Sequence, residues 1–229
     1  MTSKILKSKA YQVFDYICRL VILNLLLVIV SFSIFILIIN IFPNLKDGYQ
    51  MLFLIPTAIN LLPSIVAIAE VIKGYEIEKN SGIFKEFFMA FKKHFKKSSI
   101  LSVLLIVCVL LISNSVSYFS LMQTEGIIYT MGFGLSLSLV LVMIICLIHL
   151  PLVMIYFEDL NLLHYVKLSL IFAFKDLGLT LIATLFVVAS IFLSYLISIY
   201  FVLIAFSLTI YLIIKITKNK YIKISERNK

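Results

Sequence analysis

Charged residues are scarce in this sequence. Asp, Glu, Lys and Arg make up only 14% of its 229 residues, whereas 62% are hydrophobic. An average soluble domain is about 25% charged and about 45–50% apolar. A soluble protein of this size needs far more charge to cover its surface, so the composition excludes a soluble globular enzyme. Together with a mean hydropathy of +1.13, it predicts a polytopic membrane protein.

Signatures of catalysis and metal binding are also missing. The sequence has no G-x-S-x-G, no H-E-x-x-H, no histidine pair at helical spacing, no P-loop and no coupling-loop signature of an ABC permease. Its cysteines, Cys18, Cys108 and Cys146, lie in or beside apolar runs and form no C-x-x-C pair. We therefore expect no catalytic residue, no cofactor, no metal site and no disulfide framework.

Positive charge outweighs negative charge. The sequence has 20 Lys and Arg against 11 Asp and Glu, which gives a net charge of +9. The charges are confined to the segments between apolar runs. This distribution indicates a bilayer with anionic lipids as the partner, and not nucleic acid.

Five apolar stretches are long enough to cross a membrane, since a spanning helix needs about 20 residues. They cover residues 20–42, 51–72, 100–122, 126–157 and 179–214. The last would measure about 54 Å as one helix, which is too long for a bilayer. We expect it to form two short spans, 179–196 and 198–214, with a turn near 194–200, or else one span and a re-entrant segment.

The distribution of Lys and Arg decides the topology. If the last stretch crosses twice, 19 of the 20 positive charges face the cytoplasm. If it crosses once, the six positive charges of the C-terminal tail lie outside, against the positive-inside rule. We therefore predict an all-α transmembrane bundle that forms one domain over residues 1–229, with six crossings and both termini in the cytoplasm.

One cytoplasmic loop carries a distinctive amphipathic pattern between residues 81 and 99. Its aromatic residues recur at helical spacing on one face, and its lysines fall mainly on the other. Such a helix lies in the membrane interface, as a lead-in to the third span whose lysines fix the topology, or as a docking helix for a specific lipid or a cytoplasmic partner. The candidate docking residues are Phe84, Phe87, Phe91, Lys92, Lys93, Phe95, Lys96 and Lys97. Residues 4–19 and 158–176 repeat the pattern, so we expect three interfacial helices that form a cytoplasmic collar.

Polar residues inside the predicted spans are the other candidates, because ionisable groups in a bilayer are costly. Glu70 shares a helix face with Pro56, Asn60, Pro63 and Ala67. This face can line a proton- or cation-linked path with a proline-broken helix. Alternatively, Glu70 reaches the inner surface and pairs with Lys73, one turn away.

Further polar residues fit packing roles. His149 precedes Pro151 by two residues, so it can bond to a carbonyl group that the proline leaves free, or titrate together with Glu70. Asn24 and Asn114 are candidates for interhelical hydrogen bonds. Gly132 and Gly134 permit close packing or a bend at the start of the fourth long span.

These features together resemble the YesL-like family of bacterial membrane proteins, a domain of unknown function. The similar segments are Asn24-Leu25-Leu26, Pro63-Ser64-Ile65-Val66-Ala67 with Val71-Ile72-Lys73, Phe84-Lys85 with Phe87, Phe91 and Phe95-Lys96-Lys97-Ser98, and Pro151-Leu152-Val153 with Phe157, Leu163 and Lys167. The sequence departs from the family pattern because it has no Trp and because it has Glu70 and Gly74 where apolar and basic residues are usual. The resemblance implies a bacterial cell membrane and an accessory role beside carbohydrate-uptake and glycan-degradation systems.

Three functions follow from these patterns. The first is a non-catalytic accessory or scaffold for a solute (carbohydrate) uptake or envelope system, with other membrane proteins of that system as partners. The second is a small transporter or channel with a polar path near Glu70 and His149, which a polar cavity reaching Glu70 would favour and a dry apolar bundle would oppose. The third, an enzyme acting on lipid or glycan, would need converging reactive groups. Only Glu158, Asp159 and His164 lie close together, and these fit a helix N-terminus.

Overall fold

The computed structural model describes residues 9–41, 47–75, 82–196 and 202–227, with side chains for 13–31, 59–75, 82–190, 192–193 and 205–226. Within these residues the chain forms seven α-helices, one short 3₁₀-helix and no strand, which confirms the all-α prediction. The helices are α2 (Lys9–Ile41), α3 (Asp47–Tyr75), α4 (Ile83–Leu121), α5 (Ile127–Tyr156), α6 (Leu162–Lys175), α7 (Leu177–Leu196) and α8 (Val202–Arg227), and η1 (Gln123–Glu125) joins α4 to α5.

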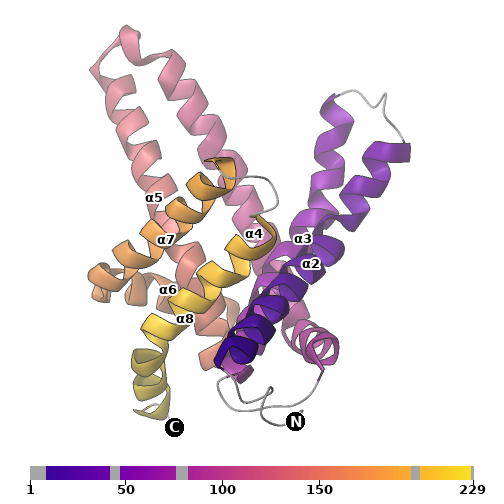
Figure 1. The fold of residues 1–229 in the computed structure, drawn as a ribbon. Coiled ribbons are helices and arrows are strands. Elements are labelled where there is room, and N and C mark those ends of the chain that lie inside the picture. Colours follow the sequence, from indigo (N-terminus) through magenta and orange to yellow (C-terminus); the bar gives the residue numbers. More distant parts are fainter. Residues whose placement is uncertain (1–8, 42–46, 76–81, 197–201, 228–229) are drawn as a thin grey trace, which may run out of the picture.

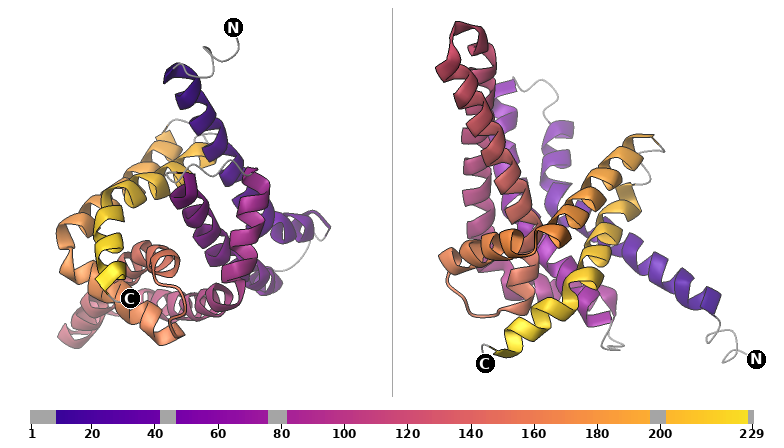
Figure 2. Two further views of the ribbon diagram at one scale, coloured as in Figure 1. Left: turned by 90° about the horizontal axis from the view of Figure 1, so that it is seen from below. Right: turned by 90° about the vertical axis from the view of Figure 1, so that its left-hand side faces the viewer.

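The helices form three hairpins, α2–α3, α4–α5 and α7–α8, and α6 runs across the bundle between the last two (Figure 1). The α2–α3 and α4–α5 hairpins meet at the lower end of the view and separate toward the upper end. The start of α2, the start of α4, the α5–α6 connection and the end of α8 all lie at this lower end, as the side view in Figure 2 also shows. The basic segments of the sequence therefore gather at one end of the bundle.

Three stretches of described helix are long and apolar enough to cross a membrane: Val13–Ser31, Ile83–Leu121 and Ile127–Tyr156. A fourth results if Leu162–Lys175 and Leu177–Ser190, which meet at 101°, count as one broken span. These helices are compatible with a membrane protein. For the described residues, three or four helices can therefore cross a membrane by length and composition, which does not establish the predicted six.

The helices extend beyond the predicted spans because amphipathic segments continue the apolar stretches without a break. Helix α2 begins at Lys9, well before the predicted span at residue 20, and α4 joins the basic segment and the third span in one helix of 39 residues. Helix α3 begins at Asp47, four residues before the predicted span at residue 51. The apolar stretch 179–214 is divided between α7 and α8, and the predicted turn near 194–200 lies largely outside the described residues.

Helix α4 changes direction between its basic and apolar parts. Figure 1 shows its first turns nearly end-on, whereas its second half rises beside α5. Near the junction, the buried Ser98 hydroxyl donates a hydrogen bond of 2.7 Å to the carbonyl oxygen of His94. A serine that bonds to the carbonyl group four residues earlier favours a bend in the helix, and the change of direction lies near this bond.

The tightly packed core is formed by buried side chains from all seven of the described α-helices. Leu23, Val66, Phe87, Leu150 and Tyr165 are buried there. The side chains at the tip of the α4–α5 hairpin are exposed instead of buried. Leu121 and Ile127 there are 80% and 77% exposed. Large apolar side chains exposed along a long helix are expected where the surrounding solvent is lipid.

Candidate functional site

A charged cluster joins α3, α4 and the α5–α6 connection. Lys93 of α4 donates hydrogen bonds of 2.9 Å to Glu70 Oε1 and 2.7 Å to Glu158 Oε1. The imidazole Nε2 of His94, a buried residue, bonds to the other oxygen of Glu70. Glu70 is thus held from two consecutive residues of α4, which fixes the packing of α3 on α4.

Lys73 does not form the ion pair with Glu70 that the sequence suggested. Its ammonium group donates a hydrogen bond of 2.7 Å to the carbonyl oxygen of Ile155 and lies 4.3 Å from the ring centroid of Tyr156. Lys73 therefore satisfies a carbonyl group in the last turn of α5, where intrahelical donors are lacking. The ion pair predicted within α3 is replaced by pairs between helices.

The cluster does not offer a metal site. The Lys93 ammonium group bonds to the carboxylates of both Glu70 and Glu158, and His94 bonds to Glu70. In the part of the chain that the structure describes, no group of three His, Cys, Asp or Glu side chains is arranged to hold a metal ion.

The aromatic residues of α4 fall into two sets, against the prediction of a single lipid-facing side. Phe87 is fully buried and Phe91 packs against the core, with 6.1 Å between their ring centroids. Phe84, Phe88 and Phe95 point outward, and the first two are 58% and 51% exposed. The second set is exposed, whereas the first set is buried or half-buried.

The lysines of α4 divide in the same way. Lys93 binds acidic residues, and Lys97 lies 3.9 Å from an oxygen of Asp159 and 5.7 Å from the ring centroid of Tyr165. Lys92 and Lys96, one turn apart, are exposed, and Lys85 lies on the same side of the helix. The exposed surface of α4 thus has a row of phenyl rings beside a row of ammonium groups. We call it the α4 stripe: Phe84, Phe88, Phe95, Lys85, Lys92 and Lys96.

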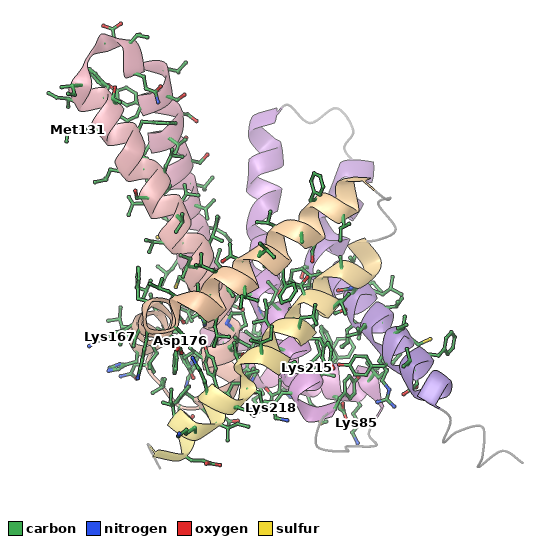
Figure 3. The ribbon with its side chains drawn as sticks, turned by 60° about the vertical axis from the view of Figure 1, so that its left-hand side comes forward. Lys85, Met131, Lys167, Asp176, Lys215 and Lys218 are labelled. Atoms are coloured by element: carbon green, nitrogen blue, oxygen red, sulfur yellow. The ribbon has the colours of Figure 1, made fainter. Side chains whose placement is uncertain are left out.

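Lysines from other helices lie at the same end of the molecule as the α4 stripe. Figure 3 shows Lys167 of α6, together with Lys215 and Lys218 of α8, at the end of the bundle that also holds Lys85. Met131, at the start of α5, lies at the opposite end. The bundle therefore has one basic and one apolar end.

His149 belongs to a second, buried network between α5, α7 and α8. Its Nδ1 lies 2.8 Å from the Tyr221 hydroxyl and its Nε2 lies 2.9 Å from Thr180 Oγ1. Thr180 donates its own proton to the carbonyl oxygen of Ala173 at 2.9 Å, so its oxygen accepts from Nε2. Tyr221 therefore donates to Nδ1, and the neutral imidazole is fully satisfied. The predicted bond to a carbonyl group freed by Pro151 is replaced by these two hydroxyl contacts.

Tyr221 is the centre of this network. Its ring stacks on Phe172 with 4.5 Å between centroids and contacts Tyr156 at 5.3 Å. Burial raises the pKa of Tyr221, so its hydroxyl stays protonated and available to His149. One residue earlier, Lys220 bonds to Asp176 Oδ1. The basic end of α8 is thereby fastened to α5 and α6.

The remaining candidate residues differ in their surroundings. Asn24 is buried, and its Oδ1 accepts a hydrogen bond of 3.1 Å from the backbone N–H of Ser207, which links α2 to α8. Asn114 lies on the exposed side of α4 and does not link helices within the described part of the chain. Pro63 is buried inside α3, whereas the side chain of Pro56 lies outside the described residues.

An apolar cavity of about 620 Å³ lies between α3, α5, α7 and α8. Its wall includes Ala69 but neither Glu70 nor His149. Among its described wall residues, Ser190 and Thr209 are polar, and they bond to each other at 2.5 Å. The cavity is therefore not a polar path of the kind predicted for a transporter.

Four side chains that bond to Glu70, Lys93 or His149 were not predicted from the sequence. They are His94, Glu158, Thr180 and Tyr221. A signal existed for His94, because it follows Phe87 by seven residues and so lies on the same side of α4. The other partners depend on contacts between helices far apart in the sequence, for which the sequence pattern held no signal.

The structure and site thus define an all-helical chain whose apolar helices are compatible with a membrane protein. Residues 20–115 match a protein family described as "Protein of unknown function, DUF624". The matched stretch contains Asn24, Pro63, Glu70 and the α4 stripe. No curated protein and no solved structure matches the chain.

Proposed function

We propose that the protein is a multi-pass protein of a bacterial cell membrane, with six crossings and both termini in the cytoplasm. The position of the start of α2 and the end of α8 at one end of the bundle supports an even number of crossings. The lysines at that same end support a cytoplasmic orientation. The antiparallel pair of α7 and α8 supplies the fifth and sixth crossings.

Within that membrane the protein acts as a non-catalytic accessory or scaffold of a solute (carbohydrate) uptake or envelope system. The family match gives no biochemical activity. The resemblance to the YesL-like family supports the accessory role, and the short η1 connection leaves little room for an external binding surface. The contacts with partner proteins are then made from the cytoplasmic end.

The observation that carries the proposal is the α4 stripe. An interfacial helix places aromatic rings at the acyl boundary and cationic groups at the headgroups. Phe84, Phe88 and Phe95 can enter the boundary while Lys85, Lys92 and Lys96 reach anionic headgroups. Each lysine near an anionic surface contributes about 1 kcal/mol. The stripe therefore anchors the cytoplasmic end to anionic lipid.

Native mass spectrometry of the protein purified in mild detergent tests this anchoring. A variant with Lys92→Gln and Lys96→Gln should retain less phosphatidylglycerol than the parent protein, because two headgroup contacts are lost. The matched control, Lys92→Arg with Lys96→Arg, keeps both charges and should retain as much as the parent. Equal retention by all three proteins would refute the anchoring role.

The same two variants test the scaffold role in cells. Affinity purification should recover a defined set of uptake or envelope proteins with the parent and the Arg variant, and less of that set with the Gln variant. An unchanged set of partners would contradict docking through the stripe. A transporter is less well supported, because the cavity is apolar and does not reach Glu70.

A further inference from the structure

We infer that the cavity between α3, α5, α7 and α8 is a binding site for one acyl chain of a membrane lipid. This site is separate from the α4 stripe and does not depend on the function proposed for it.

The wall selects for hydrocarbon. Among the residues that the structure describes, the wall is aliphatic or aromatic except for Ser190 and Thr209. These two hydroxyl groups bond to each other, and Thr209 also donates to the carbonyl oxygen of Ala205 at 2.7 Å. They offer little to a polar ligand. Water is also a poor occupant, because a buried water molecule needs two to four polar partners.

The cavity lies at the depth of the bilayer interior. Its α5 wall, from Ile144 to Leu152, belongs to the apolar stretch Ile127–Tyr156. Ile144 and Leu147 are both wall residues and exposed residues, so the cavity opens sideways at α5. An opening at this depth communicates with acyl chains and not with the aqueous phase.

The size of the cavity also fits an acyl chain. At about 620 Å³ it is within the range of about 300–1,000 Å³ that small-molecule sites occupy. Protein interiors are close-packed and tolerate few voids, so an apolar space of this size needs an occupant. The lipid that surrounds the opening is always present, which makes its acyl chains the occupant that the geometry favours.

Tryptophan fluorescence gives a direct test, because the sequence contains no Trp. Phe206 is a half-buried wall residue, and Phe192 on α7 is exposed and outside the wall. Single Phe206→Trp and Phe192→Trp variants of the full chain, in detergent micelles, are titrated with phosphatidylcholine whose acyl chains carry bromine, a contact quencher. The same titration with brominated phosphatidylglycerol reports whether the headgroup matters.

We expect quenching at Phe206→Trp to saturate at one lipid per protein with either headgroup. Quenching at Phe192→Trp should rise gradually with the lipid content of the micelle. Adding Ala205→Leu to Phe206→Trp fills the cavity and should remove the saturable component. If Ala205→Leu fails to fold, Val187→Phe enlarges a side chain on the α7 wall of the cavity and serves the same purpose.

Three results would overturn the inference. The first is gradual quenching at both positions. The second is saturable quenching that persists in a folded cavity-filling variant. The third is a dimer in light scattering together with the absence of saturable quenching at Phe206→Trp, which would show that a second copy of the chain fills the cavity.

Discussion

Lys93 and Glu70, 23 residues apart in the sequence, are joined by a hydrogen-bonded ion pair of 2.9 Å between α4 and α3. The same ammonium group reaches Glu158 beyond the end of α5. One lysine therefore connects three consecutive parts of the fold at its basic end. Lys92, its neighbour, points outward and belongs to the α4 stripe. Adjacent lysines thus have different tasks: Lys93 joins three parts of the fold, and Lys92 faces outward.

Replacing Lys93 should therefore cost stability, whereas replacing Lys92 should not. Lys93→Gln leaves two carboxylates without their shared cation. Since the three side chains are 28–56% exposed, we expect a loss of only about 1 kcal/mol in unfolding free energy. Lys92→Gln should change it by less than about 0.5 kcal/mol. Unfolding curves in detergent measure both; equal curves for the two variants would contradict the assignment.

Asn24 and Asn114 provide a second matched pair. Asn24→Leu removes the acceptor for the Ser207 N–H and should lower stability by about 0.6–2 kcal/mol, the range for hydrogen bonds between membrane helices. Asn114→Leu places an apolar side chain on the exposed side of α4 and should be neutral or stabilising. Thermal melts of the two variants should differ in this order. A larger loss for Asn114→Leu would indicate a partner for that side chain.

The His149 network predicts coupled effects. Tyr221→Phe removes one hydrogen bond and should cost about 1 kcal/mol, whereas His149→Phe leaves two buried hydroxyl groups to repartner and should cost about 1–3 kcal/mol. Because both changes remove the same contact, the double variant should cost less than their sum. Strict additivity in the unfolding data would argue against a direct bond. Tyr118→Phe, at an exposed position, is the control.

Gly132 and Gly134 differ in the space around them. A Cβ atom at Gly132 would lie 2.5 Å from the ring of Phe119 on α4, whereas nothing lies within 4 Å of a Cβ atom at Gly134. Gly132→Leu should therefore push α4 and α5 apart and cost about 1–3 kcal/mol, as overpacking does. Gly134→Leu should be tolerated. We expect the parent protein and Gly134→Leu to melt at higher temperatures than Gly132→Leu. The reverse order would be incompatible with this packing.

The sequence alone predicts the helices well because hydrocarbon imposes strong rules on length and composition. The length of the stretch 179–214 required a break, and the structure divides it into α7 and α8. The boundaries were less predictable, because an amphipathic segment can extend an apolar helix without a signal at the junction. Helix α4 is the clearest case, since no Gly or Pro separates Lys97 from the apolar residues that follow.

The partners in the site could be predicted only in part. Helical spacing places Phe84, Phe87, Phe91 and Phe95 on one side of α4. It does not predict how much of that side α3 covers. Contact with the core then buries Phe87 and leaves Phe84 exposed. Tyr221 bonds to His149 across 72 residues, so its role depends on how α8 packs against α5. Such register between distant helices is set by the tertiary fold and not by local pattern.

The central claim is that the lysine-rich end of the bundle faces the cytoplasm and that both ends of the chain lie there. Cysteine labelling in intact cells tests it most directly, in a variant whose Cys18, Cys108 and Cys146 are replaced by Ala. Single Lys92→Cys, Thr124→Cys and Lys223→Cys substitutions occupy exposed positions at the two ends. We expect a membrane-impermeant maleimide to label only Thr124→Cys in intact cells. After permeabilisation it should also label Lys92→Cys and Lys223→Cys. Labelling of Lys92→Cys or Lys223→Cys in intact cells would contradict it.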